Sequence, residues 1–171
     1  MDKNGRILAY SSNIGEVNRQ LGSIIKPVLV YATAFDEDLI TESTILNDEE
    51  INFNGYSPKN YGNKTYGNIT VKEAISISSN ICAVKVLNST KIETAKNKVK
   101  NLPLNLTEKD NFLNIALGST EKGATLKEIT SCYLPFLNNG IYSEPYVIEK
   151  ITDDKVLQNE YHRPAQIQCK I

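Results

Sequence analysis

Residues 18–35, NRQLGSIIKPVLVYATAF, are the stretch from which the fold of this chain can be worked out. The apolar residues that follow Ser23 predict a helix over residues 23–35, which is apolar on most sides, as in a helix that packs centrally against a sheet. Ser23 and Lys26 are three residues apart, so both lie on one face of that helix. The lysine amine can therefore reach the serine hydroxyl.

This pair has the residue types of a nucleophile and its base. A serine hydroxyl attacks well only when an adjacent base takes its proton, and a lysine is a base only when it is neutral. Apolar neighbours such as Ile24 and Ile25, together with the helix N-terminus, favour the neutral amine. The free N–H of Ser23 can also form half of an oxyanion hole. Taken alone, such a short pattern is more often part of an ordinary buried helix.

A second polar group, Ser78-Ser79-Asn80, follows about fifty residues later. Thr70 and Glu73 form a capping box that predicts a helix reaching to about Ser78. At a helix end, the Ser78 hydroxyl can pass a proton to a leaving amine, and the Asn80 amide can hold a carbonyl and the lysine. The alternative is that these residues only cap the helix.

These two motifs and the long segments around them resemble the transpeptidase domain of class A penicillin-binding proteins. The resemblance covers roughly residues 5–157, with Leu21 where the family usually has proline. The segments that carry it are GRILAYSS, NRQLGSIIKP, YSPKNYGNKTYGNITVKEAISISSN and LGSTEKGATLKEITSCYLPFLNNGIYSEPYVIEKITDDKVL.

The resemblance implies an α+β fold of the penicillin-binding protein and serine β-lactamase type. We expect it to be truncated, with an incomplete antiparallel sheet and a helical subdomain, and to form one partial domain over residues 1–171 without a second domain. The patterns predict a long polar surface region with Tyr56, Tyr61 and Tyr66 as packing anchors, and a helix from the capping box Thr125–Glu128 towards Gly140. In that helix Leu126, Ile129, Cys132 and Phe136 face inward, and Pro135 bends or shortens the last turn. The ranges predicted are a strand at 6–10, surface chain at 36–67, helices at 82–87 and 91–100, and a hairpin of 146–151 with 155–158.

The resemblance also implies a function, D,D-transpeptidation of bacterial peptidoglycan. Ser23 attacks the penultimate D-alanine of a stem peptide, Lys26 accepts its proton, Ser78 relays a proton to the leaving amine, and Asn80 positions the substrate amide and Lys26. The expected partners are stem peptides and β-lactams, which mimic D-alanyl-D-alanine, and the chemistry needs no metal or cofactor. The parent protein is expected at the extracytoplasmic face of the cell membrane.

The family's third motif, Lys-Thr-Gly, does not occur in these 171 residues, since Lys64-Thr65 is followed by Tyr66 and precedes the second motif. We therefore expect the isolated chain to be inactive and marginally stable, needing the remainder of the domain or associating with itself through exposed edges. A non-catalytic remnant or binding module and a D,D-carboxypeptidase are the alternatives. A serine β-lactamase is disfavoured because no segment matches its glutamate.

Composition narrows the remaining classes. The net charge of −1 gives no electrostatic reason to expect nucleic acid as a partner. The sequence shows no signal peptide and no apolar run long enough for a membrane anchor. Cys82, Cys132 and Cys169 lack metal-ligand spacing, and the first two are expected to be buried apolar residues. His162 is the only histidine, so a histidine-based triad has little support.

Overall fold

The computed structural model describes residues 1–149 and the backbone of residues 166–168. Its elements are η1 (Gly22–Ile25), η2 (Lys26–Tyr31), α1 (Ala32–Asp36), β1 (Ile45–Asp48), η3 (Tyr61–Asn63), β2 (Gly67–Thr70), α2 (Val71–Ser76), α3 (Asn80–Thr90), α4 (Ile92–Lys98), η4 (Leu113–Leu117), α5 (Leu126–Ser131), α6 (Leu134–Leu137), β3 (Ile141–Ser143) and β4 (Gln166–Gln168). In the described part of the chain, no helix is long and apolar enough to span a membrane.

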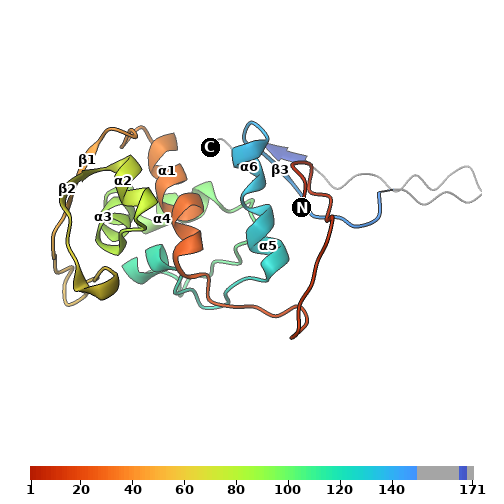
Figure 1. Ribbon diagram of the computed structural model, residues 1–171, viewed down its shortest axis with the longest axis horizontal. Helices are drawn as coiled ribbons and strands as arrows, with labels where there is room; N and C mark the ends of the chain where they lie inside the picture. The colour runs from red at the N-terminus through yellow and green to blue at the C-terminus, as the bar shows by residue number, and fades with distance from the viewer. Residues whose placement is uncertain (150–165, 169–171) are drawn as a thin grey trace, which may run out of the picture.

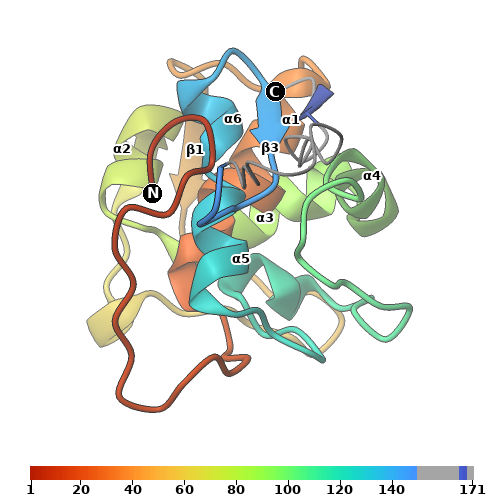
Figure 2. The same cartoon turned by 90° about the vertical axis from the view of Figure 1, so that its right-hand side faces the viewer.

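One continuous helical segment, η1–η2–α1, forms the centre of the fold (Figure 1). The β1–β2 pair with α2 and α3 lies on one side of this segment, and α5 and α6 lie on the other (Figure 1). In the perpendicular view, α5 and β3 lie in front of α3 (Figure 2). The predicted mixture of helices and strands, with only small antiparallel sheets, is confirmed.

The central helix confirms the prediction for residues 23–35, but its pitch changes along its length. It begins as a 3₁₀ turn, widens to a π-helix over Lys26–Tyr31 and ends as an α-helix. Pro27 is the second residue of η2 and lies next to the point where the pitch changes. Short π segments often occur at functional sites. The fully buried apolar side chains of the central helix are Ile25, Val28, Leu29, Val30 and Ala34.

Signals that act over three or four residues predicted the local structure well. Both capping boxes are present, with Thr70 and Glu73 at α2 and Thr125 and Glu128 at α5. The predicted amphipathic helix over 91–100 is α4, which buries Ala95 and is followed by buried Val99. Cys82 and Cys132 are buried, as expected for small apolar residues.

Three predictions about strands and turns are wrong or incomplete. Residues 6–10 form no strand, because among the described residues only Arg6 is paired, in a single bridge to Tyr146. The predicted surface region 36–67 contains β1, which pairs antiparallel with β2 from Ile45–Thr70 to Asp48–Gly67. This strand has only four residues, two apolar followed by two polar, so no alternation of apolar and polar residues could reveal it. Of the predicted hairpin, residues 146–149 are not a strand and residues 150–158 lie outside the described part, whereas β3 pairs with β4.

Two expectations about burial are also corrected. Tyr61 is 97% exposed, and Tyr66 is about half exposed, so only Tyr56 packs against the core. The single helix predicted after Thr125 is split into α5 and α6, with Pro135 in the first turn of α6. Leu126 and Phe136 are exposed, contrary to the prediction, whereas Ile129 and Cys132 are buried as predicted.

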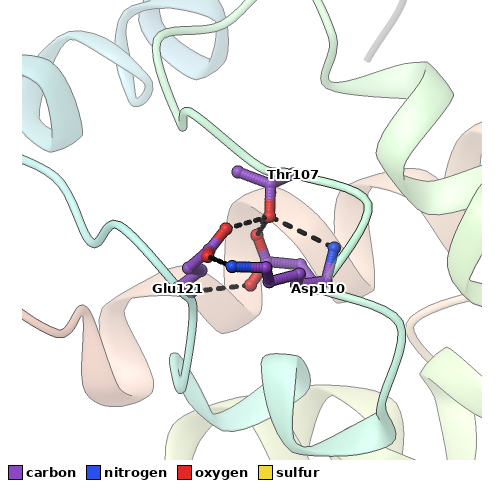
Figure 3. A network of polar contacts seen from close by, with 4 residues as sticks. Thr107, Asp110 and Glu121 are labelled. Atoms are coloured by element: carbon purple, nitrogen blue, oxygen red, sulfur yellow. Dashed lines mark hydrogen bonds and ion pairs between the residues drawn. The ribbon is translucent and has the colours of Figure 1, made fainter.

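The segment that leads into Ser23 is held by residues 118–124. Leu21 N–H donates to the Gly118 carbonyl (3.2 Å), and the Gln20 amide exchanges two hydrogen bonds with the Thr120 backbone (2.6 and 2.8 Å). Glu121 in turn donates its backbone N–H to the buried Asp110 carboxyl group (2.7 Å), which caps the turn at Thr107 (Figure 3). Contacts between distant parts of the chain therefore fix the start of the helix that carries Ser23 and Lys26.

We expect Gly118→Ala to destabilise the fold strongly. A Cβ atom at Gly118, where φ is +83°, would lie 2.1 Å from the Gly22 nitrogen, and this backbone atom cannot turn aside as a side chain would. Gly15→Ala is the matched control, because Gly15 has φ +73° with no atom within 4 Å. The control should lose about 1–2 kcal/mol from backbone strain alone, and Gly118→Ala about 1–3 kcal/mol more from overpacking. Equal losses in urea unfolding would contradict the close approach.

Candidate active site

Lys26 is the centre of a buried polar cluster. Its side chain is 2% exposed. Its Nζ donates hydrogen bonds to the Ser78 carbonyl oxygen (2.7 Å), the Ser78 Oγ (3.1 Å) and the Asn80 Oδ1 (2.6 Å). The structure thus brings three of the four predicted site residues into direct contact across more than fifty residues of sequence.

The three oxygens around Lys26 suit both protonation states of its amine. A protonated lysine has three N–H donors, and each finds one acceptor here. A neutral amine has two donors and one lone pair. Because a serine hydroxyl can donate as well as accept, Ser78 can turn its proton towards that lone pair while the other two acceptors stay in use. The cluster can therefore hold the amine before and after it gains a proton.

Burial makes the neutral amine accessible near physiological pH. Desolvation lowers the pKa of Lys26 from about 10.5 to about 8, although the nearby Cys82 opposes this shift. Burial also raises the pKa of the Cys82 thiol to about 11, so this thiol stays protonated and unreactive at neutral pH. Lys26 is therefore the group in the cluster that is suited to proton transfer.

The lowered pKa predicts how stability changes with pH. Between about pH 8 and 10.5, the unfolded chain holds a proton on Lys26 that the folded chain has lost, so the free energy of unfolding should rise with pH over this window. Lys26→Met replaces the titrating side chain by one of similar size. Subtracting its free energy of unfolding from that of the wild type removes the contributions of the other titrating residues. Urea unfolding at several pH values should show the free energy of unfolding of the wild type rising relative to that of Lys26→Met between about pH 8 and 10.5. A difference between the two that does not change with pH would contradict the lowered pKa.

Ser23 lies at the start of η1, one helical turn before Lys26. Ser23 is exposed, and in the described part of the chain its hydroxyl makes no hydrogen bond to Lys26 or to another side chain. Its carbonyl accepts the Lys26 backbone N–H, which fixes the turn between the two residues. The serine is therefore open to solvent one helical turn before Lys26, whose side-chain hydrogen bonds all go to Ser78 and Asn80.

Ser78 lies just after the end of the predicted helix, as expected, and a second helix that begins at Asn80 follows directly. α2 ends at Ser76, and Asn80 is the first residue of α3, with Ser79 as its N-cap. Ser78 has φ +56°, a left-handed conformation that is costly for a residue with a Cβ. This conformation directs both its carbonyl and its hydroxyl oxygen to Lys26.

The structure adds two buried residues that sequence reasoning missed. Asp48 accepts a hydrogen bond from Ser79 Oγ, and Asn60 accepts one from the Asn80 backbone N–H. Asn60 Nδ2 also donates to the Asp48 carboxylate. Asn60 belongs to the Tyr56-x-Pro-x-Asn-Tyr segment, so a signal for its importance was present, but not for its role. Asp48 ends a strand that was not predicted, and no local pattern marks it.

Comparisons with known proteins agree with this fold. The sequence profile of the penicillin binding protein transpeptidase domain matches residues 2–169. Penicillin-binding protein 1F of Bacillus subtilis (strain 168) is 36% identical over 136 residues, which are 80% of this chain and 19% of that protein. The chain thus spans about a fifth of the length of such curated relatives.

Solved structures show the same fold. Penicillin-binding protein 1A from Haemophilus influenzae superposes with a TM-score of 0.70 at 27% identity, over 87% of this chain and 22% of that one. Penicillin-binding protein A from M. tuberculosis, solved as an imipenem acyl-enzyme complex, gives a TM-score of 0.77 at 17% identity, over 94% and 42% of the two chains. The family resemblance predicted from the residues is confirmed: this chain belongs to the penicillin-binding protein transpeptidase domain family.

Proposed function

We propose that this chain carries the nucleophile and the proton-transfer residues of a serine D,D-transpeptidase that cross-links peptidoglycan stem peptides. One observation carries the proposal. Lys26 is buried with a lowered pKa, it is hydrogen-bonded to Ser78 and Asn80, and it lies one turn after the exposed Ser23. An exposed serine next to a buried amine has the composition of an activated nucleophile.

In the proposed reaction, the Ser23 Oγ attacks the carbonyl carbon of the penultimate D-alanine, and the neutral Lys26 amine takes the hydroxyl proton. The tetrahedral intermediate collapses when the C–N bond to the terminal D-alanine breaks and Ser78 passes a proton to the leaving amine. Lys26 returns its proton to Ser78 through their 3.1 Å contact. An amine from a second stem peptide then attacks the acyl carbon and gives its proton to Lys26. The bond from that carbon to Ser23 Oγ breaks, and Lys26 returns the proton to Ser23 Oγ, which regenerates the serine.

The role of Asn80 follows from its two ends. Its Oδ1 accepts from Lys26, and its Nδ2 donates to the Lys59 carbonyl (2.8 Å). This orientation holds the Lys26 amine in place, and the second hydrogen of the Asn80 Nδ2 is proposed to contact the substrate. We propose that β-lactams acylate Ser23 in the same way, in keeping with the acyl-enzyme described for a protein of the same fold. Because the substrate is cell-wall peptide, the site is proposed to work outside the cytoplasmic membrane.

A hybrid protein tests this function. Residues 1–149 replace the matching segment of Bacillus subtilis penicillin-binding protein 1F, so that the rest of a transpeptidase domain is supplied. A fluorescent penicillin should label the hybrid, and an excess of unlabelled penicillin should prevent the labelling. A hybrid that unfolds cooperatively, as the parent does, but takes up no label would contradict the proposal.

A further inference from the structure

Asp48 and Asn60 form a buried pair behind the cluster, which we call the Asp48–Asn60 clamp. The Asp48 side chain is completely buried at the end of β1. Its two oxygens accept hydrogen bonds from four donors: Ser79 Oγ (2.5 Å), Cys82 Sγ (3.4 Å), Asn60 Nδ2 (2.8 Å) and Tyr66 N–H (2.9 Å). No lysine or arginine of the described residues pairs with it, so these donors alone offset the cost of burying the group.

Asn60 connects this buried group to the first turn of α3. Its Oδ1 accepts the backbone N–H groups of Asn80 (2.7 Å) and Ile81 (3.2 Å). Ser79 Oγ accepts the next one, from Cys82 (3.0 Å). The free N–H groups at the start of α3 are therefore satisfied by side chains that the clamp holds, which fixes where the helix begins.

The neighbouring backbone also fixes the Asn80 side chain. Lys59, the residue before Asn60, accepts the Asn80 Nδ2 through its carbonyl (2.8 Å). With its nitrogen so engaged, Asn80 presents Oδ1 to Lys26. One short segment thus holds both the backbone and the side chain of Asn80.

Ser78 needs similar support, because its left-handed backbone persists only where the surroundings enforce it. On one side α2 holds it, through the bond from Ser78 N–H to the Ile75 carbonyl (3.1 Å). On the other side Ser79 is tied to Asp48. The two Ser78 oxygens on Lys26 therefore depend on the clamp as well.

We propose that Asp48 and Asn60 are positioning residues, which hold the Ser78 and Asn80 oxygens against the Lys26 amine. Neither touches Lys26, and both act through the start of α3. The catalytic meaning of this inference rests on the proposed function. Its geometric content does not, because the hydrogen bonds of Lys26 can be measured without substrate.

The test is the pKa of Lys26 in the folded 171-residue chain, followed by NMR of the lysine Cε and Nζ and assigned with Lys26→Arg. Asn60→Ala changes no charge and leaves Cys82, the other titratable group that acts on Lys26, in place. Loss of a charge-assisted hydrogen bond from the buried amine should lower the pKa by about one to two units. An unchanged pKa, or a rise towards the ordinary value of a solvated lysine, would overturn the proposal.

Two further variants separate positioning from loss of stability. Thr70→Ala removes the cap of α2 and destabilises the fold without touching the clamp, so the Lys26 pKa should stay within a few tenths of a unit. Asp48→Asn with Asn60→Asp exchanges the amide and the carboxylate. This double variant reverses the bond between the two side chains and keeps an acceptor for the α3 N–H groups, although it loses the bonds to Tyr66 N–H and the Lys64 carbonyl. Its Lys26 pKa should lie closer to the wild-type value than to that of Asn60→Ala, and the comparison with the wild type stands even if Asn60→Ala fails to fold. A shift in Thr70→Ala as large as in Asn60→Ala, or no restoration in the exchanged pair, would contradict the proposal.

Discussion

Ser23→Ala is expected to abolish covalent penicillin labelling of the hybrid domain completely. The acyl bond forms to the Ser23 Oγ, and alanine has no atom that can replace it. Ser23 is exposed and its hydroxyl bonds to no other side chain of the described residues, so the substitution should leave the fold intact. The readout is gel fluorescence after incubation with fluorescent penicillin, from minutes to hours.

The matched control for this loss is Ser89→Ala. Ser89 is an exposed serine on α3 whose hydroxyl bonds only to the Lys85 carbonyl of its own helix (3.1 Å). This variant should be labelled at the rate of the unmodified hybrid. Retention of the label in Ser23→Ala would mean that another residue is acylated.

Lys26→Arg is expected to slow acylation by about 10²- to 10⁴-fold, the usual contribution of a positioned general base. Arginine keeps the positive charge and the hydrogen-bond donors but cannot give up its proton at any pH at which the protein is folded. The rate of the unmodified hybrid should rise with pH towards a plateau above about 8, because only the neutral Lys26 accepts the serine proton. The rate in Lys26→Arg should lack this rise. Labelling with fluorescent penicillin, quenched at a series of times between pH 6 and 10, measures both the loss of rate and its pH dependence.

Lys26→Met separates the two ways in which a lysine could act. If Lys26 is the base, the methionine and arginine variants should be slowed to a similar extent, since neither can take a proton. If Lys26 served only as a positive charge beside the reacting carbonyl, Lys26→Arg would retain most of the activity. An arginine variant close to the wild-type rate would therefore contradict the proposed role.

The sequence was sufficient wherever an interaction joins residues close in the chain. The helix carrying Ser23 and Lys26 and both capping boxes depend on partners three or four residues apart, and all are present. Strands were harder to predict. β1 has only four residues and pairs with β2 about twenty residues away, whereas in the predicted strand at 6–10 only Arg6 is paired within the described part of the chain. Pairing partners decide whether an extended segment becomes a strand, and local patterns do not name them.

In the candidate site, too, residues within sequence motifs could be predicted, whereas a residue held only by distant contacts could not. The motifs indicated that Lys26, Ser78 and Asn80 belong to one site, and the structure brings these three into contact. The need for Asp48 was not visible, because a single aspartate in a polar stretch is normally exposed. Its burial depends on donors from four separate positions in the chain.

The most direct test of the account is to locate the penicillin adduct on the protein. The hybrid is saturated with penicillin, digested, and sequenced by fragment-ion mass spectrometry, with the untreated hybrid as reference. The account predicts one adduct, with the mass of an intact opened penicillin, on Ser23. An adduct on any other residue, or a folded hybrid with no adduct at all, would contradict the assignment of Ser23 as the nucleophile.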